Sequence, residues 1–520
     1  MFNRLGSRKL WGFFLVGNLA LALASPSPTS AGPLPPPVWG DPSCAVAPAE
    51  RVAKRELLQE SLGDPARLPA YQAKLAAHRL TLARCRAQTW PTTQATWLRL
   101  YAYDAQPGVL ADVLDRIVNR GYNRVFVEVF YDGRVLLPVN ANPTPWRSVL
   151  QEAVAEGQVD ANRDLWAETV RLAHERGLEV YGWMFALNFG YGYSDDPRRA
   201  PVFARNGAGE SSIAQARFDP ALLKDGRAFY EDAYETEHLF VDPYHPKAQA
   251  DLLAAVKAML LPQPNGILFD YIRYPTPLAA DTLVTQPQDL WIYGEASQQA
   301  LQQRFASPQQ QALLQRFLAT GRLTPEDIAQ TDLSFADSLP WFATDPFWSE
   351  RQRAEKYQAY FWQQVVEHAY SGVLQFLQTV SESALQQGIS VGGVFFPGGN
   401  RAESGGFDAR MQPWDRFPSN IERHPMSYAI CQDGGADCVA AQVGDVLQQS
   451  LPATLVCPVL AGTWGQSFGG HASLEVQMQA IQSAHPQLTC ISHFVYAWME
   501  PDSDRDRKAG IGLGDWVDED

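Results

Sequence analysis

From about residue 95 onward, short apolar runs of strand length alternate with amphipathic stretches of helical length. Apolar runs separated by helices are typical of a parallel sheet that is buried on both faces. Eight strands are predicted, at about Trp97–Tyr101, Arg124–Val129, Glu179–Ala186, Gly266–Ile272, Ile389–Phe395, Arg423–Tyr428, Thr454–Leu460 and Ile491–Trp498.

Eight strands joined by helices predict an α/β fold, a (β/α)8 TIM barrel closed by crossover connections. A doubly wound open sheet is the alternative. That fold would be favoured by a Gly-rich phosphate-binding loop after the first strand, and the segment Tyr103–Pro107 is not such a loop.

The N-terminus has the pattern of a secretory signal peptide over residues 1–24. Arg4, Arg8 and Lys9 precede an almost wholly apolar run, and Ala22-Leu23-Ala24 supplies a small-x-small cleavage pattern. The run of about 15 apolar residues is shorter than the roughly 20 needed to cross a bilayer. We therefore expect an exported protein, periplasmic, bound in the cell envelope or extracellular, with an uncleaved N-terminal anchor as the alternative.

The remaining chain divides into segments of different composition. The barrel needs roughly 250 residues, so insertions and added elements are expected in a chain of 520 residues. The predicted segments are a Pro-rich linker (25–43), an N-terminal helical hairpin (44–92), the barrel (93–500) with large loop insertions after strands three and four (about 188–239 and 277–346), and an acidic C-terminal tail (501–520).

Charge narrows the range of partners. The net charge is −15, and an acidic protein repels phosphate backbones and anionic lipids, so nucleic acids and membrane surfaces are poor partners. The chain also has 15 Trp and 19 Tyr residues. Aromatic faces stack against sugar rings, although most aromatic residues in any protein fill its core.

Six cysteines in an exported chain make disulfides plausible. The hairpin geometry brings its two cysteines to the same end, and a second pair flanks a short Gly/Asp loop. The third pair is either bridged or simply buried. No spacing resembles a zinc site, and we expect neither a metal nor a cofactor. The predicted pairs are Cys44–Cys85, Cys431–Cys438 and Cys457–Cys490.

The segment Gly266–Pro275 is an apolar strand that ends on Asp270, Arg273 and Tyr274. Barrel enzymes present their catalytic groups at the C-terminal ends of strands. Paired carboxylates suit glycosidic cleavage, because one acid protonates the leaving oxygen while the other attacks or activates water. Asp270 is the first candidate, and the alternative is an Asp that only caps the next loop.

Three acids are candidate partners for Asp270, in the order Glu128, Glu500 and Asp132. The alternative role for Glu128 is to orient Arg99. The other polar and aromatic residues at strand ends are predicted to bind substrate: Arg273, Tyr274, Trp183, Tyr101, Tyr428, His424, Trp498 and Trp464.

Four segments carry a resemblance to a known family: Ala173–Trp183, Asp242–Pro246, Gly266–Pro275 and Pro425–Tyr428. As a set they resemble the glycosyl hydrolase-like proteins related to family 10, which are exported bacterial TIM-barrel proteins. The resemblance covers about residues 95–498. It implies a (β/α)8 barrel that hydrolyses carbohydrate, with Asp270 at the position of the family's strand-four acid.

This chain departs from classical family-10 xylanases at two positions. It has no Glu at the end of strand seven, and its strand-four acid is Asp, so xylan is not inferred as the substrate. The expected function is an exported glycoside hydrolase that acts on a cell-envelope or extracellular polysaccharide. The alternative is a barrel that binds glycan without cleaving it. Two acids about 5–9.5 Å apart would favour catalysis, and a solitary Asp270 pinned by Arg273 would favour binding.

Overall fold

The computed structural model describes residues 44–131, 133–215, 238–276, 283–335, 348–403 and 405–510. The expected signal peptide and Pro-rich linker, Asp132, parts of both expected insertions and residues 511–520 of the expected tail lie outside these ranges. Within them, no helix combines the length and apolar character required to cross a bilayer.

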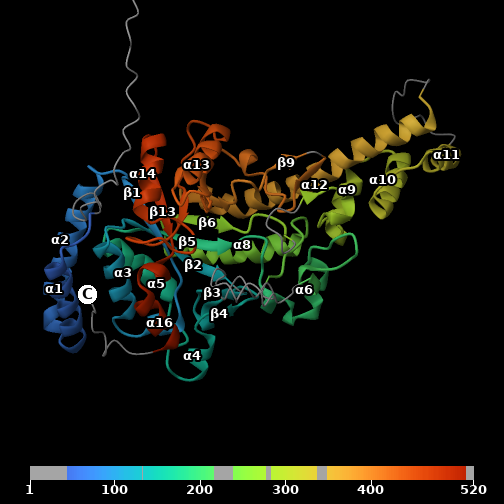
Figure 1. The fold of residues 1–520 in the computed structure, drawn as a ribbon. Coiled ribbons are helices and arrows are strands. Elements are labelled where there is room, and N and C mark those ends of the chain that lie inside the picture. Colours follow the sequence, from blue (N-terminus) through green and yellow to red (C-terminus); the bar gives the residue numbers. More distant parts are fainter. Residues whose placement is uncertain are drawn as a thin grey trace, which may run out of the picture. The chain divides into compact units, whose positions relative to one another are not determined.

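Eight parallel strands form the centre of the fold (Figure 1). In the sheet they follow the order β11-β8-β6-β5-β2-β1-β13-β12. Two parallel bridges, Arg423–Val456 and Met426–Val459, join the two ends of this order. The expected α/β barrel is therefore confirmed as a nearly closed barrel of eight parallel strands. The strands are β1 (Thr93–Leu98), β2 (Arg124–Tyr131), β5 (Glu179–Phe185), β6 (Gly266–Asp270), β8 (Ser390–Phe395), β11 (Ile421–Pro425), β12 (Val459–Ala461) and β13 (Cys490–Phe494).

Helices connect these strands because their apolar stripes cover the outer face of the sheet. In α3 (Val109–Asn119), for example, Val113, Leu114 and Ile117 are buried. The other helices that follow barrel strands are α4 (Gln151–Ala155), α5 (Leu165–Glu175), α6 (Ser212–Gln215), α8 (Pro246–Leu260), α12 (Glu350–Gln386), α13 (Asp437–Gln449), α14 (Leu474–Ala484), α15 (Tyr496–Met499) and α16 (Pro501–Ala509).

Additional elements lie between β6 and β8. The helices α9 (Glu295–Gln303), α10 (Pro308–Thr320) and α11 (Pro325–Ser334) precede the long helix α12, and α10 and α11 pack against α12 (Figure 1). Five short strands lie outside the eight of the barrel: β3 (Arg134–Val135), β4 (Arg147–Ser148), β7 (Leu283–Val284), β9 (Ala402–Glu403) and β10 (Gly406–Asp408).

Aromatic rings from non-adjacent strands meet inside the barrel. The Trp97 ring of β1 lies 4.9 Å from the Trp183 ring of β5, and the Phe126 ring of β2 lies 5.4 Å from the His424 ring of β11. Contacts between strands that are not neighbours can form only across the interior. These residues therefore mark the inward face of each strand, and alternate residues along the same strand share it.

Expected boundaries differ from the structure at several elements; β12, for example, begins at Val459 and not at Thr454. The first strand begins at Thr93 and ends at Leu98, because the chain turns at Tyr101, whose backbone N–H donates to Asp104 at 2.7 Å. The expected tail is helical over Pro501–Ala509. Arg507 of this helix is buried against Asp104 at 2.6 Å, so α16 packs on the barrel.

The N-terminal hairpin consists of α1 (Pro48–Gly63) and α2 (Leu68–Arg86) (Figure 1). It is joined to the barrel helices by a buried ion cluster around Asp115 of α3. Arg176 donates to Asp115 at 2.9 Å, the Tyr71 hydroxyl donates at 2.7 Å, and Lys54 lies 3.4 Å away. Lys54 and Tyr71 come from the hairpin, so this single carboxylate links three parts of the fold.

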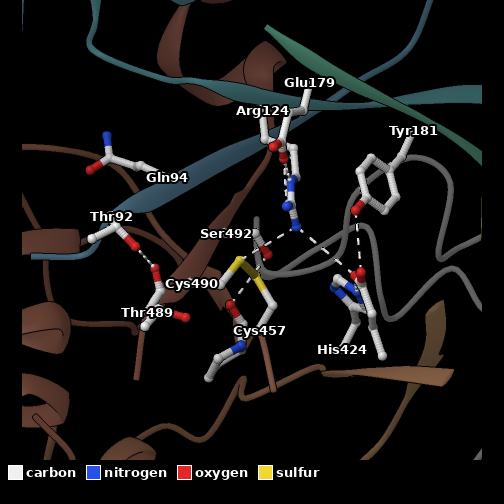
Figure 2. The surroundings of a disulfide bond; sticks show 12 residues. Thr92, Gln94, Arg124, Glu179, Tyr181, His424, Cys457, Thr489, Cys490 and Ser492 are labelled. Atoms are coloured by element: carbon white, nitrogen blue, oxygen red, sulfur yellow. Dashed lines mark hydrogen bonds and ion pairs between the residues drawn. A yellow bond between two sulfur atoms is a disulfide. The ribbon is translucent and has the colours of Figure 1, made fainter. Parts of the chain in front are cut away.

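All three predicted disulfides are present: Cys44–Cys85, Cys431–Cys438 and Cys457–Cys490. The third pair, for which burial without a bridge was the alternative, joins the start of β13 to the residues before β12. Figure 2 shows this bridge beside Arg124, whose guanidinium donates to Glu179 at 2.6 Å. The bridge therefore lies at the N-terminal end of the barrel, away from the strand ends expected to carry the site.

The disulfides should differ in their effect on stability. Cys44–Cys85 spans 41 residues and Cys431–Cys438 spans 7, and closing a longer loop removes more conformational entropy from the unfolded chain. In that model, Cys44→Ser/Cys85→Ser should lower the free energy of unfolding by about 1.5 kcal/mol more than Cys431→Ser/Cys438→Ser. Denaturant unfolding of the two double variants tests this, and equal losses would contradict it.

Candidate active site

Asp270 is the last residue of β6, at the C-terminal end of the barrel. Its register partner on β5 is Phe185, two residues after the inward-facing Trp183. The Trp183 indole Nε1–H donates to Asp270 Oδ2 at 3.2 Å, which confirms that Asp270 faces inward. The backbone N–H of Tyr271 donates to Oδ1 at 2.6 Å. The carboxyl group is thus held on both oxygens at the mouth of the barrel.

Burial raises the pKa of Asp270 above the usual range of an aspartic acid. The hydrogen bonds from Tyr271 and Trp183 and the charge of Arg273 act in the opposite direction but do not cancel this effect. A carboxyl group disfavoured in its charged form retains its proton to higher pH. Asp270 can therefore serve as a proton donor nearer neutral pH than an exposed aspartic acid can.

Arg273 lies just beyond Asp270 among aromatic rings. Its guanidinium carbon is 4.7 Å from the ring centre of Tyr271, 5.5 Å from that of Phe240 and 5.8 Å from that of Phe396. Its Nη1 donates to the backbone oxygen of Tyr274 at 3.0 Å. Arg273 is therefore positioned by ring stacking and acts on Asp270 through its charge.

Glu128 also points inward, because its register partner is Trp183. It is fully buried, and Arg99 donates to both of its oxygens, with Nη2 3.3 Å from Oε1. The guanidinium of Arg99 in turn lies 4.6 Å from the Tyr131 ring centre. An acid that orients an arginine is expected to have this arrangement. It agrees with the alternative role of Glu128, which is to orient Arg99.

Glu500 lies directly after α15, beyond the end of β13. After Phe494 the chain turns into α15, and Glu500 accepts hydrogen bonds from Arg116 and Arg120. Arg116 lies in the last turn of α3 and Arg120 directly follows this helix, where the chain leads into the start of β2. Asp270 lies at the C-terminal end of β6. The structure thus places Glu500 against two arginines of this region, and its pairing with Asp270 stays a prediction. Asp132, the third-ranked partner, lies outside the described residues.

A row of aromatic residues borders the mouth near Asp270. The Phe494 ring lies 6.3 Å from Trp183, 6.1 Å from Tyr428 and 5.5 Å from Trp498. Phe494, Tyr428 and Trp498 are half-buried, so each keeps some surface exposed. Of these three, Phe494 was not predicted, although its alternation with Cys490 in β13 would have placed it on the inward face.

Four residues expected to bind substrate are buried or form hydrogen bonds with other protein side chains. His424 is fully buried inside the barrel and contacts Glu422 at 3.2 Å, and burial lowers its pKa. Tyr274 is 1% exposed. The Tyr101 hydroxyl donates to Asp504 at 3.2 Å, and Trp464 Nε1–H donates to the Tyr122 hydroxyl at 3.0 Å. A role for these four in substrate binding stays a prediction.

Across the described ranges, no group of three or more His, Cys, Asp or Glu residues is arranged to bind a metal ion.

No family model matches the chain, and no curated protein matches it. Among solved structures, the chain is similar to a GH20 β-N-acetylhexosaminidase from Streptomyces coelicolor (9% identity, 79% of this chain, 60% of that chain, TM-score 0.35). It is also similar to a GH18 chitinase from Pseudoalteromonas aurantia (9% identity, 81% of this chain, 100% of that chain, TM-score 0.33). A hypothetical protein from Ruminiclostridium thermocellum matches at 17% identity over 35% of this chain and 78% of that chain (TM-score 0.23).

The chain thus spans about 60% of the length of the Streptomyces coelicolor enzyme. None of these similarities assigns a family or an activity to this chain, and the resemblance to the family related to family 10 stays a prediction.

Proposed function

We propose that this protein is a glycoside hydrolase that cleaves O-glycosidic bonds of a polysaccharide, with Asp270 as the proton donor. The observation that carries the proposal is the Asp270 carboxyl group, which faces inward at the C-terminal end of a parallel barrel. Burial raises its pKa, and aromatic rings able to stack on sugar rings border the same mouth.

In this mechanism the proton of Asp270 passes to the glycosidic oxygen as the bond to the anomeric carbon breaks. Water adds to the anomeric carbon, and its proton must go to a base. Glu128 accepts a hydrogen bond from Arg99, and Glu500 accepts one from Arg116. Of the three candidate acids, we therefore propose Asp132 as that base. The three disulfides fit an oxidising compartment, so we propose an exported protein acting on a cell-envelope or extracellular polysaccharide.

A second candidate function is a barrel that binds glycan without cleaving it. One observation favours it: Glu128 and Glu500 are both engaged by arginines, so among the described residues neither ranked partner offers Asp270 a second catalytic carboxylate. Incubating the protein with defined polysaccharides separates the two functions. Release of new reducing ends supports hydrolysis, and retention of the polysaccharide without release supports binding alone.

The hydrolytic activity should depend on pH in a direction set by Asp270. Because burial raises the pKa of Asp270, the protonated form is complete below that pKa and is lost as the pH rises through it. The activity should therefore decline on the alkaline side at a higher pH than the pKa of an ordinary aspartic acid, about 3.9. A profile of kcat/KM against pH measures this decline, and a descending limb at or below about pH 4 would contradict the assignment.

A further inference from the structure

Trp183 is the side chain that connects β5 to the Asp270 carboxyl group. Its indole Nε1–H donates to Oδ2 at 3.2 Å, while Oδ1 accepts the backbone N–H of Tyr271 at 2.6 Å. A carboxylate oxygen has two lone pairs. One lone pair on each oxygen is thus occupied, and one on each stays available for the proton.

The Trp183 ring is fixed by its neighbours. It stands edge-on to Trp97 at 4.9 Å and 89°, and edge-on to Phe494 at 6.3 Å and 81°. Trp183 is 7% exposed. An indole held in this way cannot turn its N–H away from Asp270 without disturbing the packing, and it offers little free face on which a sugar could stack.

We propose that Trp183 is a positioning residue, whose indole N–H orients the Asp270 carboxyl group and stabilises the carboxylate left after the proton is donated. This inference rests on the proposed function of Asp270. It also gives Trp183 a role different from the substrate contact expected from the sequence.

The carboxylate needs this hydrogen bond once Asp270 has donated its proton. A buried carboxyl group holds its proton readily, but donation leaves a charge in a site that disfavours charge. Hydrogen bonds to the charged form offset that cost. Of the described charged residues, Arg273 on the following loop acts on Asp270, and its charge favours the carboxylate.

Replacing Trp183→Phe keeps an aromatic ring but removes the N–H. The pKa of Asp270 should then rise by about one unit, because a hydrogen bond to a charged group has a strength of that order. Infrared difference titration of protein labelled with ¹³C-aspartate, with Asp270→Asn identifying the band, measures this pKa without any substrate. The alkaline limb of kcat/KM should move up by the same amount.

Trp97→Phe is the matched control. Trp97 is 1% exposed, lies in the same ring cluster and donates its Nε1–H to Ser492 at 3.2 Å. Both variants lose one buried indole hydrogen bond, but only Trp183→Phe loses a bond to Asp270. If Trp183→Phe does not fold, Trp183→benzothienylalanine removes the N–H while keeping the shape of the ring.

A shift of the Asp270 pKa in the position-183 variant but not in Trp97→Phe supports the proposal. An unchanged pKa, or equal shifts in both variants, overturns it. An unchanged pKa together with weaker oligosaccharide retention would instead make Trp183 a sugar contact. A wild-type protein without hydrolytic activity would contradict the proposed function. The titration needs no turnover, so it would still show whether the Trp183 N–H stabilises the Asp270 carboxylate.

Discussion

Asp270→Asn is expected to lower kcat/KM for polysaccharide cleavage by about 10²–10⁴-fold, the range typical of a lost general acid. The asparagine amide fills nearly the same space and can still accept from Trp183 or Tyr271, but it has no proton of suitable acidity to donate. The release of reducing ends from an active polysaccharide, measured for wild type and variant at the same pH, gives the ratio.

Asp242→Asn is the matched control for this variant. Asp242 is also buried, burial raises its pKa to about 6, and it accepts the backbone N–H of Ser297 at 2.9 Å near the start of α9. It has no role in the proposed chemistry. The expected result is activity near that of wild type for folded Asp242→Asn. Equal losses in both variants would mean that disturbed packing, and not a lost proton donor, explains the effect at Asp270.

Asp115→Ala should lower the free energy of unfolding by about 3–5 kcal/mol, because it leaves buried charges without their partner. Lys54 and Arg176 each expose about 1% of their side chains, and both lie against Asp115. The Tyr71 hydroxyl loses its acceptor as well. Denaturant unfolding monitored by circular dichroism measures the loss.

Glu50→Gln serves as the comparison for Asp115→Ala. Glu50 pairs with Lys74 at 2.8 Å on the same hairpin, but its side chain is 50% exposed. Exposed pairs contribute little because water and salt screen them, so no measurable change in unfolding is expected. A small effect at Asp115 would show that the hairpin is not held by this cluster.

The periodicity of the sequence was sufficient to predict the barrel. Apolar strands such as Gly266–Asp270 separated by amphipathic helices such as α3 allow few other arrangements. The hairpin was predictable from the Gly63-Asp64-Pro65 turn between two helical patterns. The start of β1 was not, because Thr93–Thr96 is a polar and small segment that becomes a strand only by pairing with β13 and β2.

The orientation of Asp270 could be predicted from the sequence, whereas the catalytic and substrate-binding roles stay predictions. Asp270 faces the mouth as expected, since the strand pattern fixes which residues alternate inward. Glu500 lies away from the strand end because the chain leaves β13 at Phe494. A signal was present: Pro501 followed by Asp502 and Asp504 is typical of a helix start. Such a start would have separated Glu500 from the strand.

The contacts of His424 and Trp183 depend on how neighbouring residues and strands are aligned. His424 lies beside Glu422 of the same strand, and two titratable residues at alternate positions of a strand indicate an interior polar pair. The bond from Trp183 to Asp270 depends on the alignment of β5 with β6. A single sequence carries no information on that alignment.

The most direct measurement is a crystal structure of the Asp270→Asn protein with a bound oligosaccharide of an active polysaccharide. We predict that the side-chain amide at position 270 lies within about 3 Å of a glycosidic oxygen, with sugar rings against Phe494, Tyr428 or Trp498. An oligosaccharide bound away from the mouth, or one whose glycosidic oxygens all lie beyond hydrogen-bonding distance of position 270, would contradict the account.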